Sequence, residues 1–133
     1  MLVTKTEKKE NKFQSALEYL LEYQGVKGAI IFDKEGLVVG HLCRDNADPE
    51  LFSPMALLML EQTSTVLSRL NESPAHFMIL KNNESWITIE RINDLVLVVR
   101  AGNDTNELLK VRIGQAVDMV RSYVKENYPL LTR

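Results

Sequence analysis

The chain has 133 residues, of which 45% are hydrophobic and 26% charged. This balance is typical of one folded domain and excludes collagen-like, disordered and coiled-coil proteins. Sixteen basic and eighteen acidic residues give a net charge of -2, so bulk charge does not favour nucleic-acid binding. The single cysteine, Cys43, excludes a disulfide scaffold, and no apolar run is long enough for a membrane span. We therefore expect a cytoplasmic domain without a signal peptide.

The first part of the sequence predicts a polar arm, a helix and a β-hairpin. Residues 1–12 are polar and of mixed charge, and we expect an N-terminal arm there. Apolar residues then recur at helical spacing from 13 to 20, and Gly25 is a suitable end for this helix. Two short apolar runs, 26–32 and 37–42, flank a turn that ends at Gly36, where a glycine allows a positive φ.

Gly28 lies inside the first of these runs. It resembles a fragment of a glycine-rich loop, but a glycine within a strand more often allows another element to approach closely. We interpret Gly28 as a close contact between this strand and a helix.

A long helix is predicted from 49 to 70, after an acidic loop. One face repeats at helical spacing and forms the expected core stripe: Phe52, Met55, Met59, Thr63, Val66 and Leu70. This stripe does not account for Leu57 and Leu58, which we expect to project away from the core. An apolar patch at one end of a polar helix face indicates a protein partner. Two isolated exposed leucines are the alternative.

The second part of the sequence predicts three strands and a last helix. The strands are expected at 77–81, 85–92 and 95–101, separated by turn-forming residues. Residues 102–105 supply a turn and a helix cap, and an apolar stripe follows: Leu109, Ile113, Ala116, Val117, Val120 and Val124. Residues 125–133 are expected to form a C-terminal tail, and the helix is expected to end before Pro129.

The predicted order is therefore α-β-β-α-β-β-β-α. The links between consecutive strands are short, so the sheet should be largely antiparallel. Residues 96–99 are apolar without alternation, which indicates a strand buried on both faces. Three helices can cover both faces, so we expect an α/β fold built as a three-layer α/β/α sandwich.

The sequence offers little for catalysis or for a cofactor. Nucleotide-binding patterns such as G-x-x-x-x-G-K-[ST] and G-x-G-x-x-G are absent from it. His41, Cys43 and Asp45 alternate at the end of a strand, but three ligands on one strand would surround a metal ion poorly. We expect no catalytic residues, no metal and no cofactor. Residues 33–61 hold two basic and six acidic residues, a local balance of -4, which suits either a basic partner or a solvated rim.

Several segments taken together resemble the roadblock/dynein light chain domain family over residues 13–124. They are Gly25-Val26-Lys27-Gly28-Ala29-Ile30-Ile31, Asp33-Lys34-Glu35-Gly36-Leu37-Val38-Val39, the long helix, Ile87-Thr88-Ile89-Glu90-Arg91-Ile92, Leu95-Val96-Leu97-Val98-Val99 and Asn103-Asp104-Thr105-Asn106-Glu107-Leu108-Leu109. The resemblance implies a profilin-like, five-stranded antiparallel sheet, with the first and last helices on one face and the long helix on the other.

The resemblance also implies a homodimer formed through the long helix and the strand after it. The residues placed at that interface are Met55, Met59, Gln62, Val66, His76, Phe77, Met78, Ile79 and Leu80. The sequence agrees on separate grounds, because the apolar segment 77–80 would be hazardous as an open sheet edge. A two-fold pairing with its own copy would cover it.

Members of this family have no shared active site and resemble adaptors and regulators of Ras-like GTPases. The resemblance therefore implies a non-enzymatic regulator of a small Ras-like GTPase, which would contact Leu57, Leu58, Glu61 and Thr65. Activation of GTP hydrolysis is one form of such regulation. A scaffold or motor-complex light chain without effect on hydrolysis is the first alternative, and a small-molecule sensor domain is the second.

Overall fold

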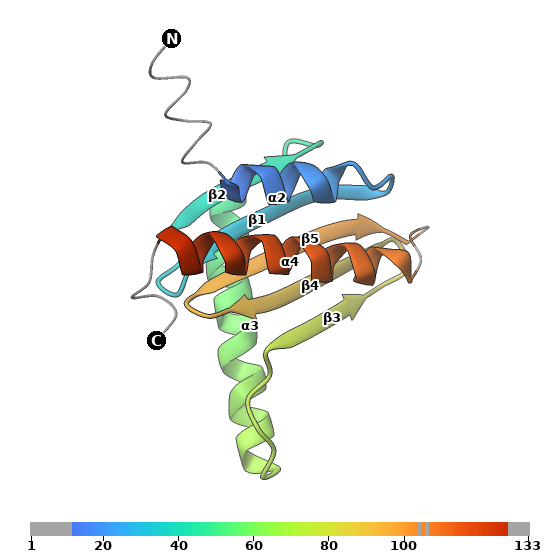
Figure 1. Cartoon of the computed structure of the whole chain (residues 1–133). Helices are drawn as coiled ribbons and strands as arrows, with labels where there is room; N and C mark the ends of the chain where they lie inside the picture. Colours follow the sequence, from blue (N-terminus) through green and yellow to red (C-terminus); the bar gives the residue numbers. More distant parts are fainter. Residues whose placement is uncertain (1–11, 104, 106, 128–133) are drawn as a thin grey trace.

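The helices and strands follow one another in the predicted order (Figure 1). The structure, a computed structural model, describes residues 12–103, 105 and 107–127. The elements are α2 (Lys12–Leu21), β1 (Val26–Asp33), β2 (Val38–Cys43), α3 (Pro49–Arg69), β3 (Phe77–Lys81), β4 (Ser85–Ile92), β5 (Leu95–Gly102) and α4 (Leu108–Asn127).

Both predicted terminal segments lie largely outside the described residues. Of the expected arm at 1–12, only Lys12 is described, and it begins α2. Of the expected tail at 125–133, residues 125–127 continue α4, and the helix ends at Asn127, before Pro129 as predicted. The predicted cap of α4 includes Asp104, which also lies outside the described residues.

The five strands form one antiparallel sheet in the order β2-β1-β5-β4-β3. β5 lies at the centre and pairs with β1 and β4, and residues 96–99 are all buried. The prediction of a strand buried on both faces is therefore confirmed. β2 and β3 form the two edges of the sheet in the part of the chain that the structure describes.

Each face of the sheet has its own apolar core, as an α/β/α sandwich requires. On one face, α2 and α4 contribute buried residues such as Leu17, Leu20, Ile113 and Val120. All six residues of the predicted α4 stripe are buried. On the other face, α3 packs against residues of β1, β4 and β5, including Phe32. The predicted three-layer architecture is confirmed.

Local signals in the sequence explain where the elements begin and turn. The Asp33 carboxylate accepts hydrogen bonds from the backbone N–H of Glu35 (2.9 Å) and of Leu37 (3.0 Å), and Gly36 adopts φ +94°. The Asp48 carboxylate accepts from the N–H of Glu50 at 3.0 Å and caps α3, as expected for a residue before Pro at the first helical position.

The close contact at Gly28 differs from the prediction. A Cβ at this position would lie 2.8 Å from the Cys43 Sγ atom, so Gly28 gives room to the neighbouring strand β2 and not to a helix. The sequence places Gly28 in a strand correctly, but it does not reveal which neighbour comes close.

The orientation of α3 also differs from the prediction. Its buried residues are Ser53, Ala56 and Leu60, whereas Met55 is 61% exposed. Ser53 and Ala56 are small and let the helix approach the sheet, which turns the helix away from the expected stripe. Leu57, which was expected to project outward, is partly buried against the α3-side core.

α3 is longer than the sheet beneath it. In Figure 1 the end of α3 and the segment after it extend beyond β3. No residue of α3 after Leu60 is buried, and Val66 is 56% exposed. None of the helices described is both long and apolar enough to cross a membrane.

Candidate functional site

His41, Cys43 and Asp45 alternate along the end of β2 and the loop that follows it. Within residues 12–103, 105 and 107–127, no three His, Cys, Asp or Glu side chains come together as a metal site. Burial raises the pKa of the Cys43 thiol, partly offset by the nearby Arg100, so the reactive thiolate is disfavoured. Asp45 turns to an arginine instead of joining His41 and Cys43.

The side of α3 that faces away from the sheet carries several exposed apolar residues. We call it the α3 surface and define it by exposed apolar residues at helical spacing: Leu51, Met55, Leu58, Val66 and Leu70. Monomeric proteins seldom present such a row on one helix, so it indicates a contact surface. The predicted core stripe is wrong for Met55, Val66 and Leu70, which are exposed, and Leu51 was not singled out. Helical spacing alone does not say which side of a helix meets the sheet.

The residues predicted to contact a partner fall into two groups. Leu58, Glu61 and Thr65 are exposed, and the Thr65 hydroxyl donates to the Glu61 carbonyl oxygen at 3.0 Å. Leu57 instead lines a hollow of about 280 Å³ together with Glu61, beside the β4–β5 turn. The Leu57 side chain contributes to the flank of α3 and not to its outer side.

The residues predicted at a dimer interface lie along α3 and β3. Met55, Gln62 and Val66 are exposed on α3, and Met59 is partly buried against the core. β3 pairs only with β4, so its second edge carries unpaired backbone groups within the described chain. Its residues Phe77, Met78, Ile79 and Leu80 are half-buried, and His76 just before them is exposed.

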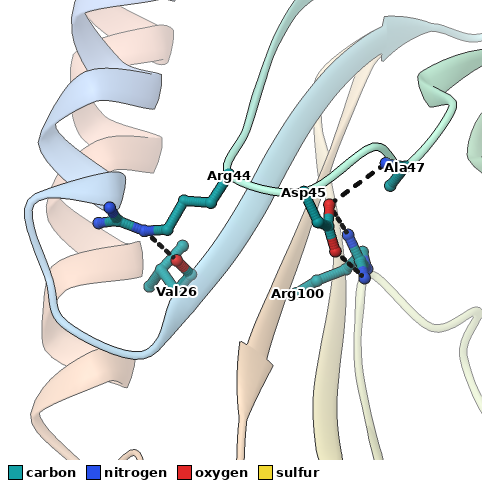
Figure 2. Close-up of polar contacts among 5 residues, drawn as sticks. All are labelled: Val26, Arg44, Asp45, Ala47 and Arg100. Carbon is teal, nitrogen blue, oxygen red and sulfur yellow. Dashed lines mark hydrogen bonds and ion pairs between the residues drawn. The ribbon is translucent and has the colours of Figure 1, made fainter.

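Two arginines fix the loop that leads into α3 (Figure 2). Arg44 donates from Nε to the Val26 carbonyl oxygen at 2.8 Å and from Nη2 to the Leu21 carbonyl oxygen at the end of α2. Arg100 forms two hydrogen bonds with the Asp45 carboxylate, at 3.2 and 3.0 Å. Both guanidinium groups therefore have structural partners.

The Arg100 side chain also affects the charge of Asp45. Its hydrogen bonds lower the pKa of the Asp45 carboxyl group below its usual value. A folded-state pKa below the unfolded one means that the ion pair supports the fold above the usual Asp range and is lost as pH falls through the lowered pKa. At neutral pH the Asp45 carboxyl group is therefore ionised.

Comparison with protein families gives one decisive match. The family model for the Roadblock/LC7 domain matches residues 12–101, which is most of the chain. The chain belongs to the Roadblock/LC7 domain family. The family resemblance inferred from the sequence is thereby confirmed, and the matched segment runs from the start of α2 to the last residues of β5.

Solved structures show the same Roadblock/LC7 fold. MglB from Myxococcus xanthus superimposes with a TM-score of 0.80 at 17% identity, covering 88% of this chain and 90% of that one. The gliding protein MglB from Thermus thermophilus gives 0.76 at 15% identity, covering 87% and 90%. A structure described as MglB with tetrameric arrangement gives 0.78 at 14% identity, covering 87% and 90%. Curated protein sequences give no match.

Proposed function

We propose that this Roadblock/LC7 protein is a non-enzymatic homodimer that binds a small Ras-like GTPase and activates its hydrolysis of GTP. The observation that carries the proposal is the α3 surface, an exposed apolar row on a helix that its own sheet covers only in its first half. Support comes from the family, whose known members act as regulators or adaptors. A regulator of such a GTPase would act in the cytoplasm.

The dimer is proposed to form through the part of α3 between Met55 and Val66 and through the open edge of β3. Met55, Met59, Gln62 and Val66 would meet the partner's helix, while residues 76–80 would extend the sheet across the two-fold axis. Burial of an exposed apolar side chain stabilises by about 1.5–3 kcal/mol when it is complete. Pairing of β3 with its copy would also satisfy the backbone groups at that edge. The tetrameric arrangement described for one MglB structure shows that this fold can self-associate in that protein.

The GTPase is proposed to bind the outer side of α3. Leu58 would be the apolar anchor, with Glu61 and Thr65 beside it and Leu57 reached through the flanking hollow. Arg44 and Arg100 are held by partners within the chain, so neither is free to approach a phosphate. We propose that activation works by ordering the GTPase's own switch loops.

The proposal is tested with the small Ras-like GTPases of the organism that encodes this protein. The purified proteins are mixed with the GTPase loaded with GDP or with a GTP analogue, and complex formation is measured together with GTP turnover. We expect a complex and faster hydrolysis. Absence of a complex in both nucleotide states would refute the proposal, and a complex without faster hydrolysis would favour the scaffold.

A pair of variants locates the contact. Leu58→Asp is expected to weaken the complex by at least about tenfold, because a charge replaces an apolar anchor at a contact centre. Val111→Asp serves as the matched control, since Val111 is similarly exposed on α4 at the opposite face. Light scattering on both variants checks that the dimer persists. Equal loss in the two variants would contradict the placement of the site on α3.

A further inference from the structure

α3 is held on the sheet by few apolar side chains. Of its three buried residues, Ser53 and Ala56 are small, and only Leu60 is a large apolar residue. Phe52, Leu57 and Met59 pack at the margins and are partly exposed. Since the free energy of packing scales with the apolar area removed from water, this contact alone constrains the direction of α3 weakly.

Polar contacts hold the short loop that leads from β2 into α3. The backbone N–H of Arg44 donates to the Lys27 carbonyl oxygen at 2.8 Å, and its side chain is bound to Val26 and Leu21. These bonds fix the start of the loop against β1 and the end of α2. They do not by themselves fix the direction that the chain takes after Arg44.

Arg100 connects this loop and α3 to β5, the central strand of the sheet. It belongs to β5, where it pairs with Gly28 of β1 and Ile87 of β4. Its guanidinium group holds the Asp45 carboxylate with two hydrogen bonds and lies 5.0 Å from the ring centroid of Phe52 in the first turn of α3. Its side chain is only 17% exposed. A planar guanidinium fixes both partners in orientation as well as in distance.

The length of α3 amplifies any change at this point. From Phe52 to Arg69 the helix runs about 25 Å at 1.5 Å per residue, so a tilt of about 10° at its start displaces its end by about 4 Å. The end of α3 extends beyond the sheet and carries Val66. A displacement of this size would misplace exposed side chains against any partner.

We propose that Arg100 is a positioning residue that sets the direction of α3 through the Arg100 clamp, which consists of Arg100, Asp45 and Phe52. Figure 2 shows Asp45 turned toward Arg100 across the loop, with the Asp45 carboxylate also accepting from the N–H of Ala47 at 3.3 Å. The clamp gives the α3 surface a fixed place relative to the sheet edge. The consequence for GTPase binding rests on the function proposed above, whereas the direction of α3 does not.

The test measures the direction of α3 within one chain. Spin labels are placed at Arg69→Cys near the end of α3 and at Val111→Cys on α4, in a Cys43→Ala background, with a tenfold excess of unlabelled protein to isolate pairs within one protomer. Arg100→Ala is expected to shift or broaden the distance distribution by about 4 Å. Arg100→Lys keeps the charge but loses the paired geometry, so a smaller change of the same kind is expected.

Two further variants separate positioning from general stability. The exchange Arg100→Asp with Asp45→Arg restores an ion pair across the loop and is expected to narrow the distribution again. Arg112→Ala is the matched control, because Arg112 bonds the Tyr19 carbonyl oxygen and stacks on the Tyr19 ring without contacting α3. Circular dichroism confirms that each variant is folded.

An unchanged distribution in the folded Arg100→Ala and Arg100→Lys proteins would overturn the proposal. An equal change in Arg112→Ala would overturn it as well, since general softening would then explain the result. If the wild-type protein binds no GTPase while the distances behave as expected, the proposed function fails and the role of Arg100 stands.

Discussion

Within the part of the chain that the structure describes, one face of the sheet is covered by α2 and α4, whereas the opposite face is covered by α3 alone. On the first face both helices bury large residues along their lengths, from Leu17 to Val124. On the second face α3 buries only Ala56 and Leu60 in its apolar core, and the sheet residues Met78, Leu80 and Ile87 stay partly exposed.

This difference indicates that the two faces of the sheet have different roles. The α2/α4 face supplies most of the buried apolar area, and hence most of the stability of the single chain. α3 extends beyond β3, so its second half has no sheet beneath it, and the proposed partner chain would cover this part. The α2/α4 face thus stabilises the single chain, and the α3 face is the one on which we propose the partner contacts.

The largest effect is expected from a cavity in the α2/α4 face. Leu17→Ala removes a side chain that is 0% exposed and should lower the free energy of unfolding by about 2–5 kcal/mol. Urea unfolding followed by fluorescence at two protein concentrations measures the loss, which should not depend on concentration. A loss that grows on dilution would show that this face is not self-sufficient. Leu58→Ala, on the exposed side of α3, should change stability by less than about 0.5 kcal/mol.

The second prediction concerns association through the α3 face. Val66→Asp should weaken the proposed dimer by at least about tenfold, because it places a charge in an apolar contact. Its effect on the fold of the protomer should be small, since Val66 is already exposed. Sedimentation at several concentrations measures the dissociation constant. Met119→Asp on α4 is the control, and a dimer that withstands Val66→Asp would contradict the assignment of the interface.

The contrast between the faces also explains what the sequence could predict. The α4 stripe from Leu109 to Val124 and the uninterrupted apolar run of β5 are buried along their whole length. Their apolar patterns in the sequence therefore predict directly which residues are buried. The order of elements and the layered fold follow from such signals and from turn residues such as Gly36.

The rotation of α3 could not be predicted in the same way. Apolar residues occur all round its segment 55–60, so periodicity allows more than one buried side. The small residues Ser53 and Ala56 decide the outcome by allowing close approach, while Met55 turns outward and Leu57 inward. The ion pair of Asp45 with Arg100 joins residues 55 positions apart, which no local pattern reveals.

A third prediction concerns Gly36, in the turn between β1 and β2 that contacts α3. Gly36 has φ +94°, and a Cβ there would lie 3.4 Å from the Leu57 Cδ1 atom. Gly36→Ala should therefore destabilise the protein by about 1 kcal/mol through backbone strain. Gly114→Ala is a contrasting control in α4, where a Cβ meets no atom within 4 Å and should stabilise by about 0.5–1 kcal/mol. Thermal unfolding compares the two, and a stabilising Gly36→Ala would rule out strain at the turn.

The smallest effect is expected from the charge of Glu90, which lies half-buried on β4. Burial raises the pKa of its carboxyl group, while Arg121 of α4 and His76 lower it and Asp118 of α4 raises it. A folded-state pKa above the unfolded one means that the neutral form favours the fold. The stability contributed by this group is therefore present below the unfolded pKa and declines as pH rises through the raised value.

Glu90→Gln removes this ionisation and keeps the shape of the side chain. The variant should be slightly more stable than wild type at pH 7, and the difference should disappear as pH falls below the usual Glu value of 4.5. Thermal unfolding at pH 7 and pH 4 measures both points, with Glu84→Gln in an exposed turn as the control. A variant less stable than wild type at pH 7 would mean that the attraction to Arg121 outweighs burial. The charged Glu90 side chain would then stabilise the packing of α4 on the sheet, because its attraction to Arg121 would exceed the cost of its burial.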